Sequence, residues 1–184
     1  MNRLHSPTGA SLFDRHPPHF SPAVHSIAWA GRPTHPNDRN RSLKLDAFAP
    51  LAQLAGVRFV SLQKGGAAAE AKSLPEGMEL LDVGQELKDF ADTAALVAAL
   101  DLVIAVDTSV VHLAGAMGKP VWVLLPFAPD WRWLLDRNDT PWYPTLRLFR
   151  QKRRMEWDPV VASIREELQS LVSSQDSPLL HHQS

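Results

Sequence analysis

The chain has 184 residues, of which 45% are hydrophobic and 21% charged, and its formal net charge is -1 at pH 7. This length suits one domain with a substantial core, and the near-neutral charge gives no bulk electrostatic reason for binding nucleic acid or an acidic membrane. The chain contains no cysteine, which excludes disulfides, thiolate nucleophiles and cysteine-based zinc sites and is consistent with a reducing compartment.

The two ends of the chain differ in composition from its middle. Residues 1–22 hold prolines among Ser, His and Arg, without apolar periodicity and without the basic-then-apolar layout of a secretory signal. Residues 173–184 are similarly polar, and no apolar run approaches the roughly 20 residues that a membrane helix needs. We therefore expect a disordered leader over 1–22, one domain over 23–172, a disordered tail over 173–184, and a cytoplasmic location with no membrane span.

Short apolar runs alternate with helical patterns between these ends. The predicted strands cover residues 24–30, 57–62, 78–83, 102–106, 120–125 and 145–149. The predicted helices cover 46–54, 67–73, 92–100, the segment that follows residue 107, and 158–171. Asp46, then Asp92 or Thr93, and later Asp158 stand where these helices should begin. Strands that alternate with helices at this spacing predict an α/β fold with a doubly wound, mostly parallel, Rossmann-like sheet.

The stretch DTSVVH, residues 107–112, follows the most apolar predicted strand. Asp107 ends that strand, and Thr108 or Ser109 can cap the next helix, whose first amides and dipole then form an anion site. Thr108 and His112 are four residues apart and share a helix face, so hydroxyl, amides and imidazole should converge. The spacing alone favours a plainer interpretation, in which the stretch is an N-cap and His112 packs against the sheet.

Two other loops are expected at the same edge of the sheet, because ligands gather beyond the carboxyl ends of parallel strands. The loop after the first strand is rich in arginine, and guanidinium groups bind phosphate bidentately, although a solvated loop explains the same composition. Gln63 and Lys64 before two glycines add an amide and an ammonium group after the second strand. Three such loops at one edge favour a diphosphate site more than any one of them does.

The segment PFAPDWRWLLDRNDTPWY, residues 126–143, contains three of the six tryptophans and the one tyrosine. Aromatic rings beside acids and arginines suit the faces of sugars, so Asp130, Trp131 and Arg132 are candidate sugar or acceptor contacts. An alternative of equal weight is a satellite core in which Trp131 and Trp133 anchor a long loop. The eight histidines form no metal-binding spacing, and five of them fall in the two ends, so we expect no metal site.

Several of these stretches together resemble a known family. DLVIAVDTSVVHLAGAMGKPVWVLLP resembles the nucleotide-sugar-binding signature of the lipopolysaccharide heptosyltransferase family. WAGRPTHPNDRNRSL, FVSLQKG and LPFAPDWRWLLDRNDTPWYPTLRLFRQ are similar to the glycosyltransferase-like C-terminal domain of bacterial tetratricopeptide-repeat proteins. The similarity spans about residues 26 to 151 and several motifs, so it is more specific than any one loop.

The resemblance implies a glycosyltransferase of the GT-B architecture, of which this chain would be the C-terminal, nucleotide-sugar-binding half. It places the donor diphosphate on Thr108, Ser109, His112 and Arg41, and Asp107, Gly31, Gln63 and Lys64 support that site. The helix predicted over 92–100 would flank the base or ribose. Transferases of this architecture neutralise the leaving diphosphate with amides and basic groups, so the resemblance implies a nucleoside-diphosphate sugar as donor, with neither metal nor cofactor.

The resemblance also implies what the chain lacks. The N-terminal domain, which supplies acceptor contacts and the general base, and the tetratricopeptide repeats would come from a separate polypeptide. The resemblance favours an enzyme and leaves open whether the isolated chain is active. Two alternatives to a donor-binding domain stay open here: a catalytically silent fragment that acts through protein association, and a nucleotide-sugar epimerase-like enzyme.

Overall fold

The computed structural model describes residues 23–175, so the predicted leader over 1–22 and the tail beyond residue 175 lie outside the described residues. A six-stranded sheet forms the centre of the fold, and its strands follow the order β3-β2-β1-β4-β5-β6. All five strand pairs are parallel. The strands are β1 (Ala23–Ala28), β2 (Val57–Ser61), β3 (Leu80–Asp82), β4 (Leu102–Val106), β5 (Val121–Leu125) and β6 (Leu146–Arg150). This is the strand order of the Rossmann fold, and the predicted α/β class is confirmed.

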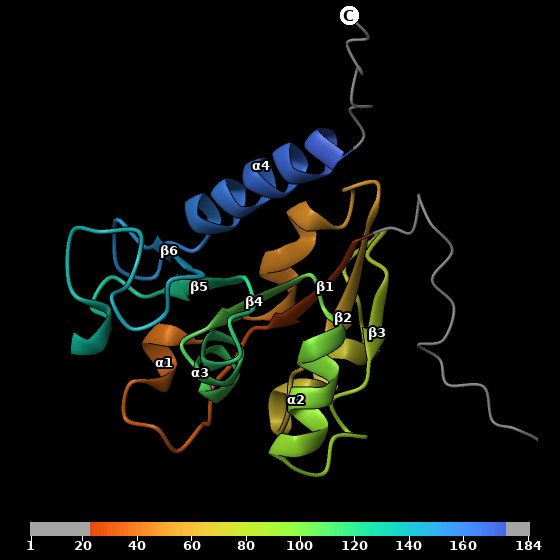
Figure 1. Cartoon of the computed structure of the whole chain (residues 1–184), viewed down its shortest axis with the longest axis horizontal. Helices are drawn as coiled ribbons and strands as arrows, with labels where there is room; N and C mark the ends of the chain where they lie inside the picture. Colours follow the sequence, from red (N-terminus) through yellow and green to blue (C-terminus); the bar gives the residue numbers. More distant parts are fainter. Residues whose placement is uncertain (1–22, 176–184) are drawn as a thin grey trace, which may run out of the picture.

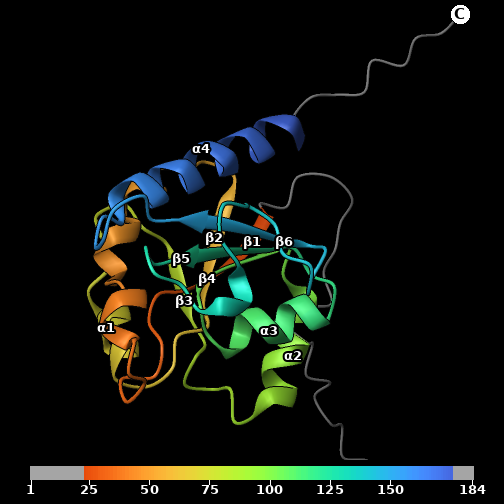
Figure 2. The same ribbon diagram turned by 90° about the vertical axis from the view of Figure 1, so that its left-hand side faces the viewer.

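Helices connect the strands and cover both faces of the sheet. The α-helices are α1 (Asp38–Arg41), α2 (Phe90–Ala99), α3 (Ser109–Ala116) and α4 (Asp158–Gln175). Short 3-10 helices form η1 (Leu45–Leu51), η2 (Gly66–Lys72) and η3 (Trp131–Trp133). Figures 1 and 2 show the sheet with α4 on one face and with α2 and α3 on the other. None of the helices in the described part of the chain is long and apolar enough to span a membrane.

Several predicted helix limits were wrong. In place of the helices predicted over 46–54 and 67–73, the structure has the 3-10 helices η1 and η2, of seven residues each, and η1 ends at Leu51. Asp46 does not cap η1, which begins after Lys44. α4 continues to Gln175, so residues 173–175, predicted as part of the tail, are helical.

Asp89 caps α2, in place of the predicted Asp92 or Thr93. Its carboxylate accepts hydrogen bonds from the amides of Ala91 at 2.8 Å and Asp92 at 3.0 Å. Asp92 Oδ2 accepts a bond from the amide of Lys88 at 2.8 Å, so two acids satisfy the first turn together. The apolar periodicity used for the prediction begins inside the helix, and the exposed Phe90 at its start hides the true boundary.

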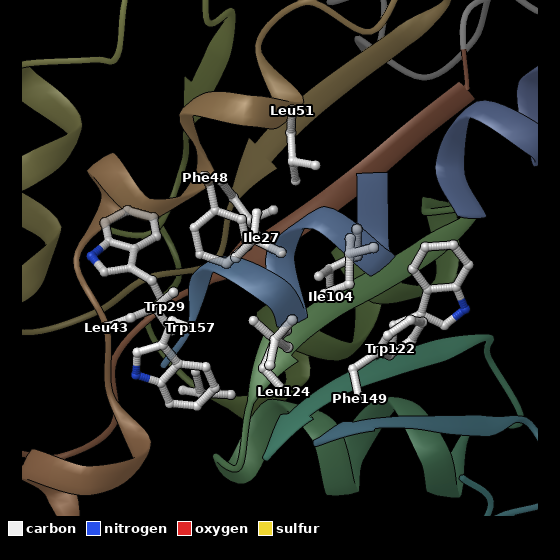
Figure 3. Close-up of a cluster of buried hydrophobic side chains, with 14 of the residues drawn as sticks. Ile27, Trp29, Leu43, Phe48, Leu51, Ile104, Trp122, Leu124, Phe149 and Trp157 are labelled. Atoms are coloured by element: carbon white, nitrogen blue, oxygen red, sulfur yellow. The ribbon is translucent and has the colours of Figure 1, made fainter. Parts of the chain in front are cut away.

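The central strands are buried on both sides, and their side chains alternate between two apolar clusters. Ile104 and Leu124 point to the cluster under η1 and α4, whereas Val103 and Val123 point to the cluster under α2 and α3. Figure 3 shows the first cluster, where Trp29, Phe48 and other large side chains from β1, β4, β5 and η1 pack together. These strands therefore form a rigid floor whose carboxyl ends hold the loops of the candidate site.

Candidate functional site

A cleft of about 890 Å³ lies beyond the carboxyl ends of the strands. Its walls are the loops that follow β1, β2 and β4, the start of α2, and the segment before and within η3. β1 and β4 are neighbours, but the chain leaves β1 toward β2 and leaves β4 toward β5, so the connections diverge and a crevice opens between them. Every predicted site residue except Trp131 lines this cleft: Gly31, Arg41, Gln63, Lys64, Asp107, Thr108, Ser109, His112, Asp130 and Arg132.

Arg41 is anchored to the end of β4. Its Nη1 donates a hydrogen bond to the main-chain oxygen of Asp107 at 2.7 Å, and its Nε lies 3.4 Å from Oδ1 of Asp38. Gly31 leaves room for the guanidinium, because a Cβ at this position would lie 2.4 Å from Arg41 Nη2. Ser42 fixes the same corner, accepting from the amide of Gly31 and donating to Asp38, both at 2.9 Å. The guanidinium is thus placed by main-chain geometry at the edge of the cleft.

The side-chain amide of Gln63 is already engaged by main-chain groups, so it is not free to contact a ligand. Its side chain is buried, and its Oε1 accepts hydrogen bonds from the amides of Trp29 at 3.0 Å and Ala30 at 2.9 Å. Its Nε2 donates to the main-chain oxygens of Ala30 at 3.0 Å and Lys64 at 2.9 Å. Gln63 therefore ties the loops after β1 and β2 together. Lys64 is exposed, and its ammonium group donates to the main-chain oxygen of Leu87.

The start of α3 is open toward the cleft. Thr108 occupies the N-cap position, but its side chain makes no capping hydrogen bond, and its Oγ1 is buried without a partner. Thr108 is therefore the N-cap residue, one of the two that the sequence offers, but without a side-chain cap; Ser109 is the first helical residue, with an exposed side chain. The amide of Val111 donates to the main-chain oxygen of Thr108 at 3.1 Å, and because no side chain caps this turn, the amides of Ser109 and Val110 are left for a ligand in the cleft.

His112 is held by partners from three sides. Its Nδ1 lies 3.2 Å from the hydroxyl of Tyr143, and its Nε2 lies 3.8 Å from Oδ1 of Asp107. Its ring stacks on Trp133 with 5.4 Å between ring centroids and 20° between the planes. The imidazole is half-buried, so one edge of a fixed ring borders the cleft.

Asp107 is ionised more readily than an ordinary aspartate. Its burial opposes ionisation, but the neighbouring imidazole of His112, with weaker help from Trp133 and Arg41, holds the pKa of the carboxyl below its usual value. The indole N–H of Trp133 contributes although it falls short of a hydrogen bond of normal geometry. The site therefore contains one fixed carboxylate among its basic groups.

The predicted sugar contacts separate into two groups. Asp130 and Arg132 line the cleft and pair with each other at 3.3 Å, whereas Trp131 is 71% exposed, outside the cleft lining, with Arg132 stacked over its ring. Trp133 is 1% exposed and belongs to the core. The sequence left open whether these tryptophans contact a sugar or belong to a satellite core. Trp133 belongs to a core, and Trp131 does not.

Sequence reasoning missed how Trp133, Tyr143 and Gly115 support His112. The aromatic segment over 126–143 predicts sugar contacts or a satellite core, and no motif in the sequence predicts a role for Gly115. No short-range signal shows that these rings back a histidine, because the contact between His112 and Tyr143 spans 31 residues of chain. A glycine inside the last turn of α3 is the one available clue. Within residues 23–175, no group of three or more His, Asp or Glu is arranged to hold a metal ion.

Comparison with known proteins finds a family similarity in the segment that carries most of this cleft. Residues 46–125 match the family model described as glycosyltransferase family 9 (heptosyltransferase). The matched segment covers less than half of the chain. It runs from η1 to the end of β5 and includes the open start of α3.

Similar proteins extend beyond that segment. Protein FlbA of Caulobacter vibrioides is 34% identical over 149 residues, which are 73% of this chain and 25% of FlbA. The crystal structure of the glycosyl transferase family 9 from Veillonella parvula DSM 2008 has a TM-score of 0.51 at 12% identity, covering 83% of this chain and 46% of that one. The crystal structure of TarM has a TM-score of 0.47 at 14% identity, covering 90% of this chain and 31% of that chain. The chain thus spans a quarter of its curated relative, and the family 9 structure shares its fold.

Proposed function

We propose that the chain is the donor-binding part of a glycosyltransferase and that its cleft binds a nucleoside-diphosphate sugar. The observation that carries this proposal is the uncapped start of α3 at the switch point of the sheet, with Arg41 anchored beside it. Exposed amides at a positive helix end, together with a guanidinium, form an anion site in a chain whose net charge is close to zero.

The diphosphate would lie against Ser109 and the first amides of α3, with Arg41 and His112 at its sides. The Thr108 hydroxyl would reach it only after rotating out of its buried position. The start of α2 would flank the base or ribose, and Asp130 and Arg132 would border the sugar. These amides and basic groups would stabilise the negative charge that develops on the leaving diphosphate, and no metal is part of the proposal.

A complete transfer reaction needs an acceptor hydroxyl aligned with the donor and a base to take its proton. We propose that a further polypeptide or region, of the kind joined to tetratricopeptide repeats in bacterial proteins, supplies both as the N-terminal half of a GT-B enzyme. The proposal is supported by coverage, since the chain spans 46% of the solved family 9 chain and 25% of FlbA. The lack of cysteine agrees with a cytoplasmic location for such a protein.

Titration of the purified chain with UDP, ADP, GDP and their sugars by calorimetry tests donor binding. At least one nucleotide should bind, and Arg41→Ala should weaken it by about 10- to 100-fold, as expected for the loss of a charge-assisted hydrogen bond. Arg39→Ala is the matched control, because Arg39 is exposed on the same short helix and does not line the cleft. Absence of binding by every nucleotide, or equal weakening by both substitutions, would contradict the proposal.

A second candidate function is association with another protein without catalysis. It is favoured by large apolar side chains that are exposed around η3, namely Phe127, Trp131, Leu135 and Trp142. In that case the chain would ignore nucleotides and would self-associate as its concentration rises, which sedimentation velocity measures. A monomer that binds nucleotide excludes this candidate.

A further inference from the structure

We propose that Tyr143 is a positioning residue for His112, fixing the imidazole so that its proton is on Nε2, the nitrogen on the cleft side. The contact that carries this inference is the 3.2 Å approach of the Tyr143 hydroxyl to Nδ1 of His112. The orientation of the ring is a property of the ligand-free chain. Its use in holding a phosphate rests on the proposed function.

The two ring nitrogens of His112 face different surroundings. Asp107, which Nε2 approaches at 3.8 Å, lines the cleft, whereas Tyr143 lies behind His112 and outside the cleft lining. Stacking on the buried Trp133 fixes the plane of the ring. With its plane set by Trp133, the remaining alternative for the imidazole is a half-turn about its Cβ–Cγ bond. The hydroxyl of Tyr143 favours the orientation that keeps Nδ1 toward it.

The charge on Asp107 determines which nitrogen carries the proton. The pKa of Asp107 lies below its usual value despite its burial, so the carboxyl is ionised at neutral pH, and an ionised carboxylate can only accept hydrogen bonds. A proton on Nε2 therefore faces an acceptor, and Nδ1, left with a lone pair, accepts from the Tyr143 O–H. The opposite tautomer would turn a lone pair toward the carboxylate. Arg41, the other charged group at this carboxylate, contacts the main-chain oxygen of Asp107 and leaves this assignment unchanged.

Gly115 makes the approach of Tyr143 possible. A Cβ on Gly115 would lie 2.8 Å from Cγ and 3.0 Å from Cδ1 of the Tyr143 ring, and 2.9 Å from Cδ1 of Leu146, closer than packed atoms allow. Gly115 is three residues after His112 in α3, so both lie on one side of the helix. A glycine inside a helix costs about 1 kcal/mol relative to alanine, and the space it leaves for Tyr143 is a physical reason for its presence.

The result is a hydrogen-bond donor that is oriented before a ligand arrives. Nε2–H is too far from Asp107 for a strong hydrogen bond, so a phosphate oxygen in the cleft can share its proton without any rearrangement of the ring. Hydrogen-bond donors that are already oriented stabilise a developing negative charge most strongly. Tyr143 would act on the ligand only through His112.

Long-range proton–nitrogen NMR of the ligand-free, full-length chain with labelled histidine tests the assignment. The His112 signals are identified by their loss in His112→Gln. The wild type should show one tautomer, protonated on Nε2, with an Nδ1 signal displaced by its hydrogen bond. Tyr143→Phe removes one oxygen and should abolish that displacement, while the proton should stay on Nε2 because Asp107 still faces it. Thr145→Val, which removes an exposed hydroxyl nearby, should leave the His112 signals unchanged.

A second variant should disrupt the contact between Tyr143 and His112 while leaving the Tyr143 hydroxyl in place. Gly115→Ala should push the Tyr143 ring away and reproduce the His112 spectrum of Tyr143→Phe, and the double variant should add little to either single change. A wild-type proton on Nδ1, or His112 signals that do not respond to Tyr143→Phe, overturns the proposal.

Binding of inorganic pyrophosphate separates this proposal from the proposed function. If the wild type binds pyrophosphate, Tyr143→Phe should weaken it by about three- to tenfold, the usual effect of one neutral hydrogen bond. A wild type that binds neither pyrophosphate nor any nucleotide overturns the diphosphate site, and the NMR spectra still decide the role of Tyr143. Unchanged pyrophosphate affinity in Tyr143→Phe contradicts a functional role for the contact.

Discussion

Single residues in this cleft act mainly by holding one another in place. Gln63 was correctly expected at the edge of the sheet, but all its amide contacts go to main-chain atoms of neighbouring loops. Arg41 and Asp107 were also expected there, and the structure adds the bond between the guanidinium and the main-chain oxygen of Asp107. The residue types were predictable from the sequence, but their partners were not, because each partner belongs to a different loop.

Gly31 provides a direct test of how Arg41 is held. Gly31→Ala should displace the guanidinium, since the added Cβ would lie 2.4 Å from Nη2 and 2.7 Å from the carboxylate of Asp38. We expect nucleotide affinity to fall about as far as in Arg41→Ala, by roughly 10- to 100-fold, in the same calorimetric titration.

Gly66→Ala is the matched control for that change. Gly66 follows β2, and a Cβ there would meet nothing within 4 Å. Its nucleotide affinity should equal that of the wild type. If Gly31→Ala also binds like the wild type, Arg41 is not needed in its observed position.

At the scale of elements, buried strands were the easiest to predict and short helices the hardest. β4 and β5 have apolar residues at consecutive positions because helices cover both faces of the sheet, and this pattern has few alternatives. η1 and η2 have the composition of helices but only seven residues each, so α-helical propensity does not decide their form. The sequence did not predict that Asp89 caps α2, because the spacing of apolar residues does not show which side chain accepts hydrogen bonds from the first amides of a helix.

The closing helix α4 gives the stability prediction at this scale. Leu168 on its inner side is 0% exposed and packs in the cluster beneath η1, whereas Leu171, almost one turn later, is 41% exposed. Leu168→Ala should lower the free energy of unfolding by about 2–5 kcal/mol, and Leu171→Ala by about 1 kcal/mol or less. Urea denaturation followed by circular dichroism measures both. Equal losses would mean that α4 does not dock as observed.

For the whole molecule, the alternation of strands and helices predicted the doubly wound sheet, and the sheet brings the site together. The switch between β1 and β4 collects loops from residues 31, 63 and 107 onward into one cleft. The contact of His112 with Trp133 and Tyr143 could not be predicted, because the long segment between β5 and β6 has no periodic pattern that fixes its path. The least predictable part of the fold therefore determines how one predicted site residue is oriented.

The central claim is that the open start of α3 and the Arg41 corner bind a nucleoside diphosphate. The most direct measurement is a map of amide shifts in proton–nitrogen NMR as UDP, ADP or GDP is added to the full chain. The largest shifts should fall on the amides of residues 107–112 and 30–41, and the α4 amides over 160–171 should stay in place. Shifts at α4 or β6 with none at the start of α3, or no shifts with any nucleotide, would contradict it.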